Sequence, residues 1–370
     1  KTKFLSLLMV AITAPFASWT MGGLEAVFMC LWVTLFVYWE IRQHENLSVF
    51  ACLICALIRP EGVMLFFVML AHRMLFKKEK LKIIRQSFIF IFPFGIYLLW
   101  RYMYYGYLLP NTAFSKLDPS LQTSEKALTW LLAFFQLRPL FSILVIIALV
   151  ILVWKKQIFD QKWSLVIWVV GAYVFFILYS GSDWMPNHRF LVPVLLLFCP
   201  LLGKTLSFVK QKLLKPLIFS IALGALILEV YMAMVVYIPY SPELGNYTDG
   251  LIRGGMWIRE NTQPDDVIAV FDAGALAYYS ERRVIDILGL NDEHIAHTPY
   301  KSDPDYVLAY HPKIMQLHIG TSPNGEVIAP SREDRNNNIY YREDFQKFYS
   351  PYLEKITDPY FPLFFIRQQD

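Results

Sequence analysis

The sequence predicts an α-helical polytopic membrane domain of about eight or nine membrane segments, some of them short, followed by a small extracytoplasmic α/β domain. Three observations lead to this fold class. Hydrophobic residues make up 56% of the 370 residues and charged residues only 17%, which is too apolar for an ordinary soluble protein. Apolar stretches of membrane-spanning length recur up to residue 240. The residues after this point are polar and show the alternation of a soluble domain.

The membrane domain is expected to occupy residues 1–240. A bilayer core about 30 Å thick is crossed by roughly 20 mostly apolar helical residues. The expected segments are, in order, 4–20, 22–41, 47–58, 61–76, 84–104, 137–154, 163–180, 189–203 and 216–240. The third, fourth and eighth segments are short for a complete crossing.

The extracytoplasmic domain is expected to occupy residues 241–370. Residues 265–271 and 283–288 alternate like strands, and the segments beside them are expected to be helical. Asp272 follows the first expected strand, and ligands of α/β sheets favour the carboxyl ends of strands. Asp272 is therefore a candidate for contacting a ligand or the membrane domain, although the full dinucleotide-binding fingerprint is missing.

The basic residues predict the orientation in the membrane. They gather in four clusters: Lys1 and Lys3; Arg73, Lys77, Lys78, Lys80, Lys82 and Arg85; Lys155, Lys156 and Lys162; and Lys204, Lys210, Lys212 and Lys215. The positive-inside rule places all four clusters in the cytoplasm. The 105–136 loop, the 181–189 insert and the C-terminal domain then lie on the opposite side.

A charged and aromatic insert at residues 181–189 separates two apolar stretches. Charge beside hydrocarbon is unfavourable and usually marks a functional site. Asp183 fits a base or a sugar ligand, and Trp184 offers a flat apolar face to a sugar ring. His188 is of a type that titrates near neutral pH, and Arg189 fits a phosphate clamp. In the structural alternative, Asp183 and Arg189 only pair with each other, and Trp184 anchors the loop at the interface.

Two further polar motifs face the same side. The proline in Arg59-Pro60-Glu61 breaks an apolar stretch, so that Arg59 and Glu61 would lie below the outer membrane face. The alternative is an internal ion pair that joins helices. Glu25 follows two glycines at a turn, where it serves either as a helix cap or as a carboxylate in the same cavity.

The loop after residue 104 holds another pair of candidates. Its tyrosines are typical of an interfacial belt. Asn111 and Lys116 follow them and would place an amide and a cation over a lipid-linked phosphate. The four cysteines lie in apolar segments and predict packing, and His294 and His297 have no evident third zinc ligand. No cofactor or metal cluster is evident, and a single divalent ion on a donor phosphate stays compatible with the sequence.

The ordered motifs carry a resemblance that covers nearly the whole chain. They are Ala14-Pro15-Phe16-Ala17-Ser18-Trp19 with Gly22-Gly23-Leu24-Glu25, Arg59-Pro60-Glu61-Gly62, Leu109-Pro110-Asn111-Thr112, Gly181-Ser182-Asp183-Trp184-Met185, and Arg189-Phe190-Leu191-Val192-Pro193. This set resembles the polytopic GT-C glycosyltransferases, most of all the bacterial terminal arabinofuranosyltransferase group. Residues 257–275 and 286–290 resemble the extracytoplasmic domain of the same group.

The resemblance implies a multi-pass enzyme of the bacterial cytoplasmic membrane with its C-terminal domain outside. Such enzymes transfer a sugar from a polyprenyl-phosphate donor to a glycan or lipid acceptor of the cell envelope, and no nucleic acid is involved. The family's catalytic acid is expected before Lys1, so the chain is expected to be a fragment lacking the first helices and first external loop. The substrate-binding residues would then be Glu25, Arg59, Glu61, Asn111, Lys116, Asp183, Trp184, His188 and Arg189.

Two other functions stay open at this point. A noncatalytic membrane scaffold with an external recognition domain would also fit a chain without the expected first loop. A lipid or solute transporter would carry charge within the membrane as well, but related halves are expected in that class and no internal repeat is evident.

Overall fold

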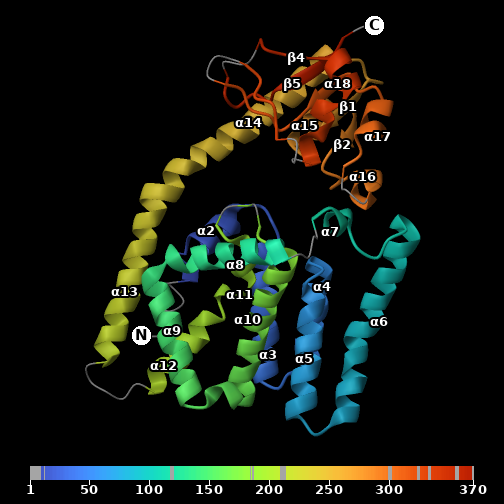
Figure 1. The fold of residues 1–370 in the computed structure, drawn as a ribbon. Helices are drawn as coiled ribbons and strands as arrows, with labels where there is room; N and C mark the ends of the chain where they lie inside the picture. Colours follow the sequence, from blue (N-terminus) through green and yellow to red (C-terminus); the bar gives the residue numbers. More distant parts are fainter. Residues whose placement is uncertain are drawn as a thin grey trace. The chain divides into compact units, whose positions relative to one another are not determined.

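A computed structural model describes residues 10–11, 13–116, 121–183, 185, 187–208, 214–298, 302–322, 326–331, 335–354 and 358–368 (Figure 1). The chain divides into two compact units. The N-terminal unit comprises Lys1–Leu108 and Asp118–Tyr237, and the C-terminal unit comprises Leu109–Leu117 and Ile238–Asp370. The short segment 109–117, which was expected in the membrane domain, thus belongs with the C-terminal unit.

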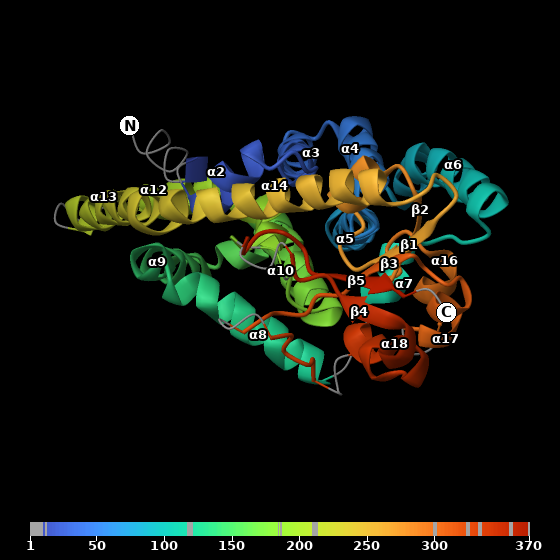
Figure 2. The ribbon, with the colours of Figure 1, turned by 90° about the horizontal axis from the view of Figure 1, so that it is seen from above.

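The N-terminal unit is helical throughout its described part. Its elements are α2 (Ala14–Met21), α3 (Ala26–Ile41), α4 (Glu45–Ile58), α5 (Gly62–Phe76), α6 (Lys80–Tyr105), α8 (Leu121–Gln136), α9 (Pro139–Trp154), η1 (Gln157–Phe159), α10 (Gln161–Ser180), η2 (Arg189–Leu191), α11 (Val192–Leu195), α12 (Phe198–Phe208), α13 (Leu214–Met232) and η3 (Ala233–Tyr237). In Figures 1 and 2, α8 lies crosswise to α9.

Within the part of the chain that the structure describes, three helices are long and apolar enough to cross a membrane: Lys80–Tyr105, Gln161–Ser180 and Pro216–Val235. Two bent pairs raise the number to five if each pair is one span. The bends are 117° between α2 and α3 and 101° between α8 and α9. The expected segment at 189–203 is divided into η2, α11 and the start of α12. The count of eight or nine segments stays a prediction, because breaks shorten several of the apolar stretches.

Close helix contact accounts for the glycine at the start of α5. A Cβ atom at Gly62 would lie 2.2 Å from the carbonyl group of Cys55 on α4. Only a glycine therefore lets the chain reverse so tightly after the Arg59-Pro60-Glu61 break. Cys52 and Cys55 are free thiols buried in this helix packing, and their burial alone accounts for them, since free cysteine behaves as a small hydrophobic residue.

A buried polar network joins α3, α4, α5 and α6. Arg73 is 1% exposed, and its guanidinium donates to the Glu40 carboxylate at 3.0 and 2.5 Å and to Ser48 Oγ at 2.6 Å. Lys77 Nζ lies 2.7 Å from Glu45 Oε1 at the edge of the network. The basic cluster around Arg73 is expected on the cytoplasmic side. Arg73 itself is enclosed by the helix packing, where Glu40 and Ser48 satisfy its donors.

The C-terminal unit is built on a five-stranded sheet with the order β2-β1-β3-β5-β4. Its elements are α7 (Asn111–Lys116), α14 (Ile238–Asn261), β1 (Val267–Val270), α15 (Ala275–Ser280), β2 (Arg283–Asp286), α16 (Glu293–His297), α17 (Pro304–Ala309), β3 (Ile314–Gln316), η4 (Arg335–Tyr341), α18 (Glu343–Phe348), β4 (Tyr349–Pro351) and β5 (Phe364–Arg367). β1 is parallel to β2 and β3, while β5 is antiparallel to β3 and β4. The two expected strands are confirmed as β1 and β2.

Both faces of this sheet are covered. Ile258 of α14 and Leu276 of α15 pack with Ile268 on one face, and Ile295 of α16 and Val307 of α17 pack on the other. The helix α14 comes very close to the segment before β5. Added Cβ atoms at its glycines would clash with Tyr360, Pro362 and Tyr279; these glycines are Gly250, Gly254 and Gly255. The glycines therefore fix α14 against the sheet.

Candidate functional site

Three helix breaks of the N-terminal unit bring charged side chains together. The first is the turn between α2 and α3, where Gly23 has a φ of +66° and Glu25 follows. The second is the Arg59-Pro60-Glu61 break between α4 and α5. The third is the 181–191 segment between α10 and α11. Each break interrupts an apolar helix and so places polar side chains where the surrounding helices are hydrophobic.

Arg59 lies between two carboxylates. Its Nε atom is 2.7 Å from Glu61 Oε1 and 3.4 Å from Glu25 Oε1. The side chains of Arg59 and Glu61 are 12% and 6% exposed, whereas that of Glu25 is 39% exposed. Glu25 thus makes the longer contact and is the carboxylate that can leave Arg59 most easily.

Arg189 and Asp183 form a second buried pair. Arg189 Nε donates to Asp183 Oδ2 at 2.8 Å, and Nη2 donates to Oδ1 at 3.2 Å. The Met185 amide also donates to Asp183 Oδ1, at 3.3 Å. The two hydrogen bonds from Arg189 to Asp183 form a bidentate contact, which holds the guanidinium in a fixed plane.

Phe190 joins the two pairs. The Cζ atoms of Arg59 and Arg189 lie 5.2 and 5.4 Å from the centre of its ring. Arg189 Cζ is also 5.5 Å from the ring of Trp19. The structure therefore gathers Glu25, Arg59, Glu61, Asp183 and Arg189 in one cluster, which we call the arginine cluster. An anion beside this cluster would be attracted by both guanidinium groups and repelled by the three carboxylates.

Asn187 and His188 hold the loop in a strained conformation. Their φ angles are +60° and +50°, which L-residues adopt at a cost of roughly 1–3 kcal/mol each. Asn187 Nδ2 donates to Ser18 Oγ at 3.0 Å, and His188 Nε2 lies 3.1 Å from the carbonyl oxygen of Trp130. Because a carbonyl oxygen only accepts, Nε2 carries the hydrogen. These two contacts fix the loop to α2 and α8.

The His188 side chain packs against aromatic rings of α8. Its ring lies 4.6 Å from the ring of Trp130 and 5.3 Å from that of Phe134. Burial, helped by the charge of Arg138, lowers the pKa of His188 to about 4. The imidazole is therefore neutral at physiological pH, and the expectation that it titrates near neutrality was wrong. Burial among apolar side chains disfavours the charged imidazolium and therefore lowers the pKa of the side chain.

A further buried ion pair joins two residues that none of the sequence motifs contains. Arg138, at the bend between α8 and α9, has its Nε atom 2.8 Å from Oε1 of Glu229 on α13. Glu229 Oε2 accepts the backbone N–H of Ala14 at 3.2 Å. The sequence did contain a signal for this pair. Glu229 is the single carboxylate within the apolar stretch 216–240, and a charge in such a stretch requires a partner.

The remaining expected site residues of the membrane domain are placed elsewhere or not described. Asn111 begins α7 and Lys116 ends it, so both belong to the C-terminal unit. α7 packs there through Phe114, whose ring lies 4.1 Å from that of His297. The side chain of Lys116 and the whole of Trp184 lie outside the described residues.

Asp272 is held within the C-terminal unit. Its Oδ2 atom accepts from the Tyr247 hydroxyl and from Gln316 Nε2, both at 2.9 Å. Gln316 Oε1 in turn accepts the backbone N–H groups of Phe271 and Asp272, at 2.8 and 2.9 Å. This arrangement ties the ends of β1 and β3 to α14, so the contacts of Asp272 account for it as a structural residue.

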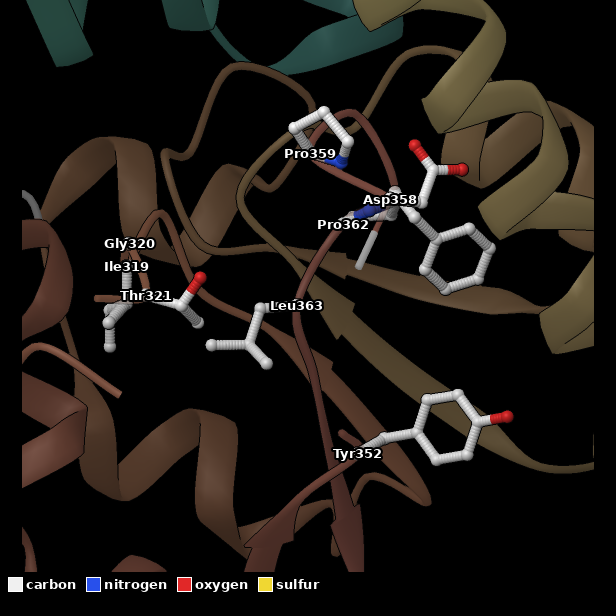
Figure 3. A pocket seen from close by; sticks show the side chains of 9 residues that line it. Ile319, Gly320, Thr321, Tyr352, Asp358, Pro359, Pro362 and Leu363 are labelled. Carbon is white, nitrogen blue, oxygen red and sulfur yellow. The ribbon is translucent and has the colours of Figure 1, made fainter. Parts of the chain in front are cut away.

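A small cavity of about 140 Å³ lies beside the ends of β3 and β5 (Figure 3). It is lined by Ile319, Gly320, Thr321, Tyr352, Asp358, Pro359, Phe361, Pro362 and Leu363. In Figure 3 the Leu363 side chain points towards Thr321, whereas the Asp358 carboxylate points away from both. Asp358 pairs with Arg253 of α14. The cavity is thus lined mainly by apolar side chains and backbone.

The chain was compared with known families, curated proteins and solved structures. A family model described as "Domain of unknown function (DUF8728)" matches residues 245–363. The matched residues all lie in the C-terminal unit. No curated protein and no solved structure matches the chain.

Proposed function

We propose that the protein is a membrane glycosyltransferase that moves a sugar from a polyprenyl-phosphate donor to a glycan or lipid acceptor. In this proposal the enzyme lies in the cytoplasmic membrane of a bacterium and works on the outer face, where its C-terminal domain also lies. The arginine cluster would receive the donor phosphate. The observation that carries the proposal is the pair of buried arginines, Arg59 and Arg189, on either side of Phe190.

Phosphate chemistry fits this pair. When a sugar leaves a polyprenyl phosphate, negative charge grows on the phosphate oxygens, and preorganised cations stabilise that charge. Asp183 holds one edge of the Arg189 guanidinium in place through Nε and Nη2. Arg59 keeps a buried Nη1 for which the described residues provide no hydrogen-bond partner. An incoming phosphate oxygen would satisfy this donor and displace Glu25, the exposed carboxylate of the cluster.

The location of the cluster favours a lipid-linked substrate. Its charged residues lie at breaks between helices that are long or apolar enough to belong to a membrane. A phosphate carried on an isoprenoid chain suits a charged site that is bordered by such apolar helices. The ordered motifs that resemble GT-C glycosyltransferases include all five residues of the cluster. The catalytic base stays unassigned, and Glu25, Glu61 and Asp183 are proposed to orient substrate.

A transfer assay tests the proposal. The full-length protein, including the first external loop expected before Lys1, would be purified in lipid nanodiscs and given radiolabelled decaprenyl-phosphate pentose and hexose donors with a membrane extract as acceptor. We expect sugar incorporation with at least one donor. Arg59→Ala should reduce the rate by roughly 10²-fold or more, and Arg259→Ala should leave it unchanged. Arg259 is a suitable control because it forms an exposed ion pair with Glu281.

The scaffold alternative has one observation in its favour. Asp183, Glu25 and Glu61 all contact an arginine, as in an internal ion-pair network. If the cluster serves only to join helices, Arg59→Ala will lower the folded yield, and no donor will be consumed by the wild-type protein. Consumption of donor by a well-folded wild type with a slow, well-folded Arg59→Ala variant would reject the scaffold.

A further inference from the structure

The arginine cluster is flanked by buried polar atoms without a hydrogen-bond partner among the described residues. They are Trp19 Nε1, Arg59 Nη1 and Tyr173 Oη. Trp19 is 8% exposed and Tyr173 is 1% exposed, so water does not reach these groups freely. Buried donors are nearly always paired in folded proteins. Other such atoms occur in the described part of the chain, for example Trp32 Nε1 and His72 Nδ1. The three named above, however, lie around a single charged cluster, which points to a partner that the described residues do not supply.

These atoms come from separate parts of the fold. Trp19 belongs to α2, Arg59 to the break between α4 and α5, and Tyr173 to α10. The Trp19 ring is 5.5 Å from Arg189 Cζ. Tyr173 interacts electrostatically with Glu61 and Arg59. The unpaired atoms therefore lie on the Arg189 side and on the Arg59 side of the same cluster.

We infer that Trp19 and Tyr173 bind the ligand together with Arg59, and that this ligand is a phosphate-bearing anion. The inference deepens the proposed function and rests on it. The indole and guanidinium nitrogens can only donate, and a hydroxyl donates as well. The ligand must then supply several acceptor atoms, which a cation or an amine does not. A phosphate supplies three or more acceptor oxygens and also the negative charge that suits two guanidinium groups.

Two substitutions separate ligand binding from folding. Tyr173→Phe and Trp19→Phe remove the donor and keep an aromatic ring in the buried position. If the Tyr173 hydroxyl is unpaired in the free protein, Tyr173→Phe should leave the unfolding temperature unchanged or raise it, because a buried polar group without a partner is unfavourable. Trp19→Phe also removes buried ring volume, so this variant is judged by its ligand affinity alone. Binding of the phosphate ligand should nevertheless become weaker, by roughly tenfold for each lost hydrogen bond to a charged group.

The experiment measures the unfolding temperature of the full chain in detergent against increasing decaprenyl phosphate. Decaprenol and inorganic phosphate serve as separate ligands, and ligand binding raises the unfolding temperature more strongly the tighter the ligand binds. The matched controls are Tyr179→Phe, an exposed tyrosine on the same helix, and Trp154→Phe, an exposed tryptophan. We expect decaprenyl phosphate to stabilise the wild type and both controls alike, with a weaker response from the two site variants.

Three outcomes would overturn the inference: no binding of either phosphate by the wild type, unchanged affinity in both site variants, or a fall of several degrees in the ligand-free unfolding temperature of Tyr173→Phe. The last result would mean that the protein itself supplies the partners. A full response to inorganic phosphate but no gain from the lipid would keep the inference and reject a lipid-linked donor. Sugar transfer with unaffected binding in the variants would reject the inference and keep the proposed function.

Discussion

Arg59 and Arg189 come from distant parts of the chain, yet their guanidinium carbons lie 5.2 and 5.4 Å from the same Phe190 ring. Two cations attract the electrons of one ring but repel each other. Glu61 and Asp183 reduce this repulsion, because each carboxylate pairs with one of the two arginines. Because Glu25 is a third carboxylate beside these two cations, an anion gains most where it displaces Glu25 from Arg59.

Glu25 is expected to compete with the ligand. It lies 3.4 Å from Arg59 and is the exposed carboxylate of the cluster. Glu25→Gln removes a negative charge next to the proposed phosphate position, so decaprenyl phosphate should bind several-fold more tightly. Titration of the ligand into detergent-solubilised protein measures this change. Weaker binding would show instead that the Glu25 charge supports the bound state. The control is Glu281→Gln, which removes a carboxylate of the other unit.

The Arg138 and Glu229 pair should be essential for folding. Both side chains are buried, at 3% and 9% exposure. Removing one partner of a buried ion pair typically costs about 3–5 kcal/mol, because the other charge stays buried. Glu229→Gln and Arg138→Met should therefore lower the unfolding temperature strongly.

The double variant Arg138→Met with Glu229→Met provides the check on this reasoning. It leaves no unpaired charge at this pair and should be less destabilised than Arg138→Met alone. Thermal unfolding in detergent measures all the variants against wild type, with Glu229→Met as the second single variant. If the double variant loses as much stability as the sum of the two single losses, the two residues do not act as a pair.

The contact between His294 and Asp303 predicts a small pH dependence in the C-terminal unit. His294 Nε2 lies 2.8 Å from Asp303 Oδ2, and this hydrogen bond lowers the pKa of Asp303 below its ordinary value of 3.8. A lowered carboxyl pKa stabilises the fold above the unfolded-state pKa, and this contribution is lost as the pH falls through the folded-state pKa. Asp303 also caps α17 by accepting the Tyr306 N–H at 3.0 Å.

Amide-exchange protection of residues 304–309 should therefore decrease below about pH 4. His294→Ala removes the hydrogen bond, so its protection should be lower at neutral pH and should change less on acidification. Hydrogen exchange followed by mass spectrometry at several pH values gives the comparison. Identical pH profiles for wild type and variant would show that His294 does not stabilise the Asp303 carboxylate.

The orientation in the membrane can be tested by labelling. The distribution of lysine and arginine predicts that residues 73–85 are cytoplasmic and that the C-terminal unit lies outside. The exposed residues Lys78 and Tyr278 are suitable positions for single cysteines in a background without the native ones. A membrane-impermeant thiol reagent added to intact cells should modify Tyr278→Cys and leave Lys78→Cys unmodified. The reverse pattern would reject the orientation and the outer-face reaction.

The break at Arg59 could be predicted from the sequence, because a proline between two short apolar stretches removes a backbone donor and interrupts the helix. The insert at 181–189 was also visible, since its charges interrupt hydrophobic sequence. The strands β1 and β2 followed from alternation in residues 265–271 and 283–288. In each case the information is local, so that neighbouring residues alone define the feature.

Other parts depend on contacts between distant residues. Trp19 and Tyr173 resemble ordinary core aromatics in the sequence, and only the absence of a described partner for their polar atoms sets them apart. Arg73 has the sequence context of a surface charge, and only the fold shows that Glu40 and Ser48 enclose it. The division of residues 189–203 into short helices was hidden because uniformly apolar sequence does not define where a helix ends.

Arg189 provides the most direct test of phosphate recognition. Its guanidinium is bidentate to Asp183, and this planar geometry also suits two phosphate oxygens. Lysine would keep the charge and lose the paired donors. Arg189→Lys should therefore fold but transfer sugar slowly, and Arg189→Ala should be slower still, by roughly 10²-fold or more relative to wild type. The rates would be measured with the decaprenyl-phosphate donor on protein of confirmed folding. If Arg189 only holds the loop through Asp183, Arg189→Ala will lower stability, while the remaining folded protein turns over donor at a near wild-type rate.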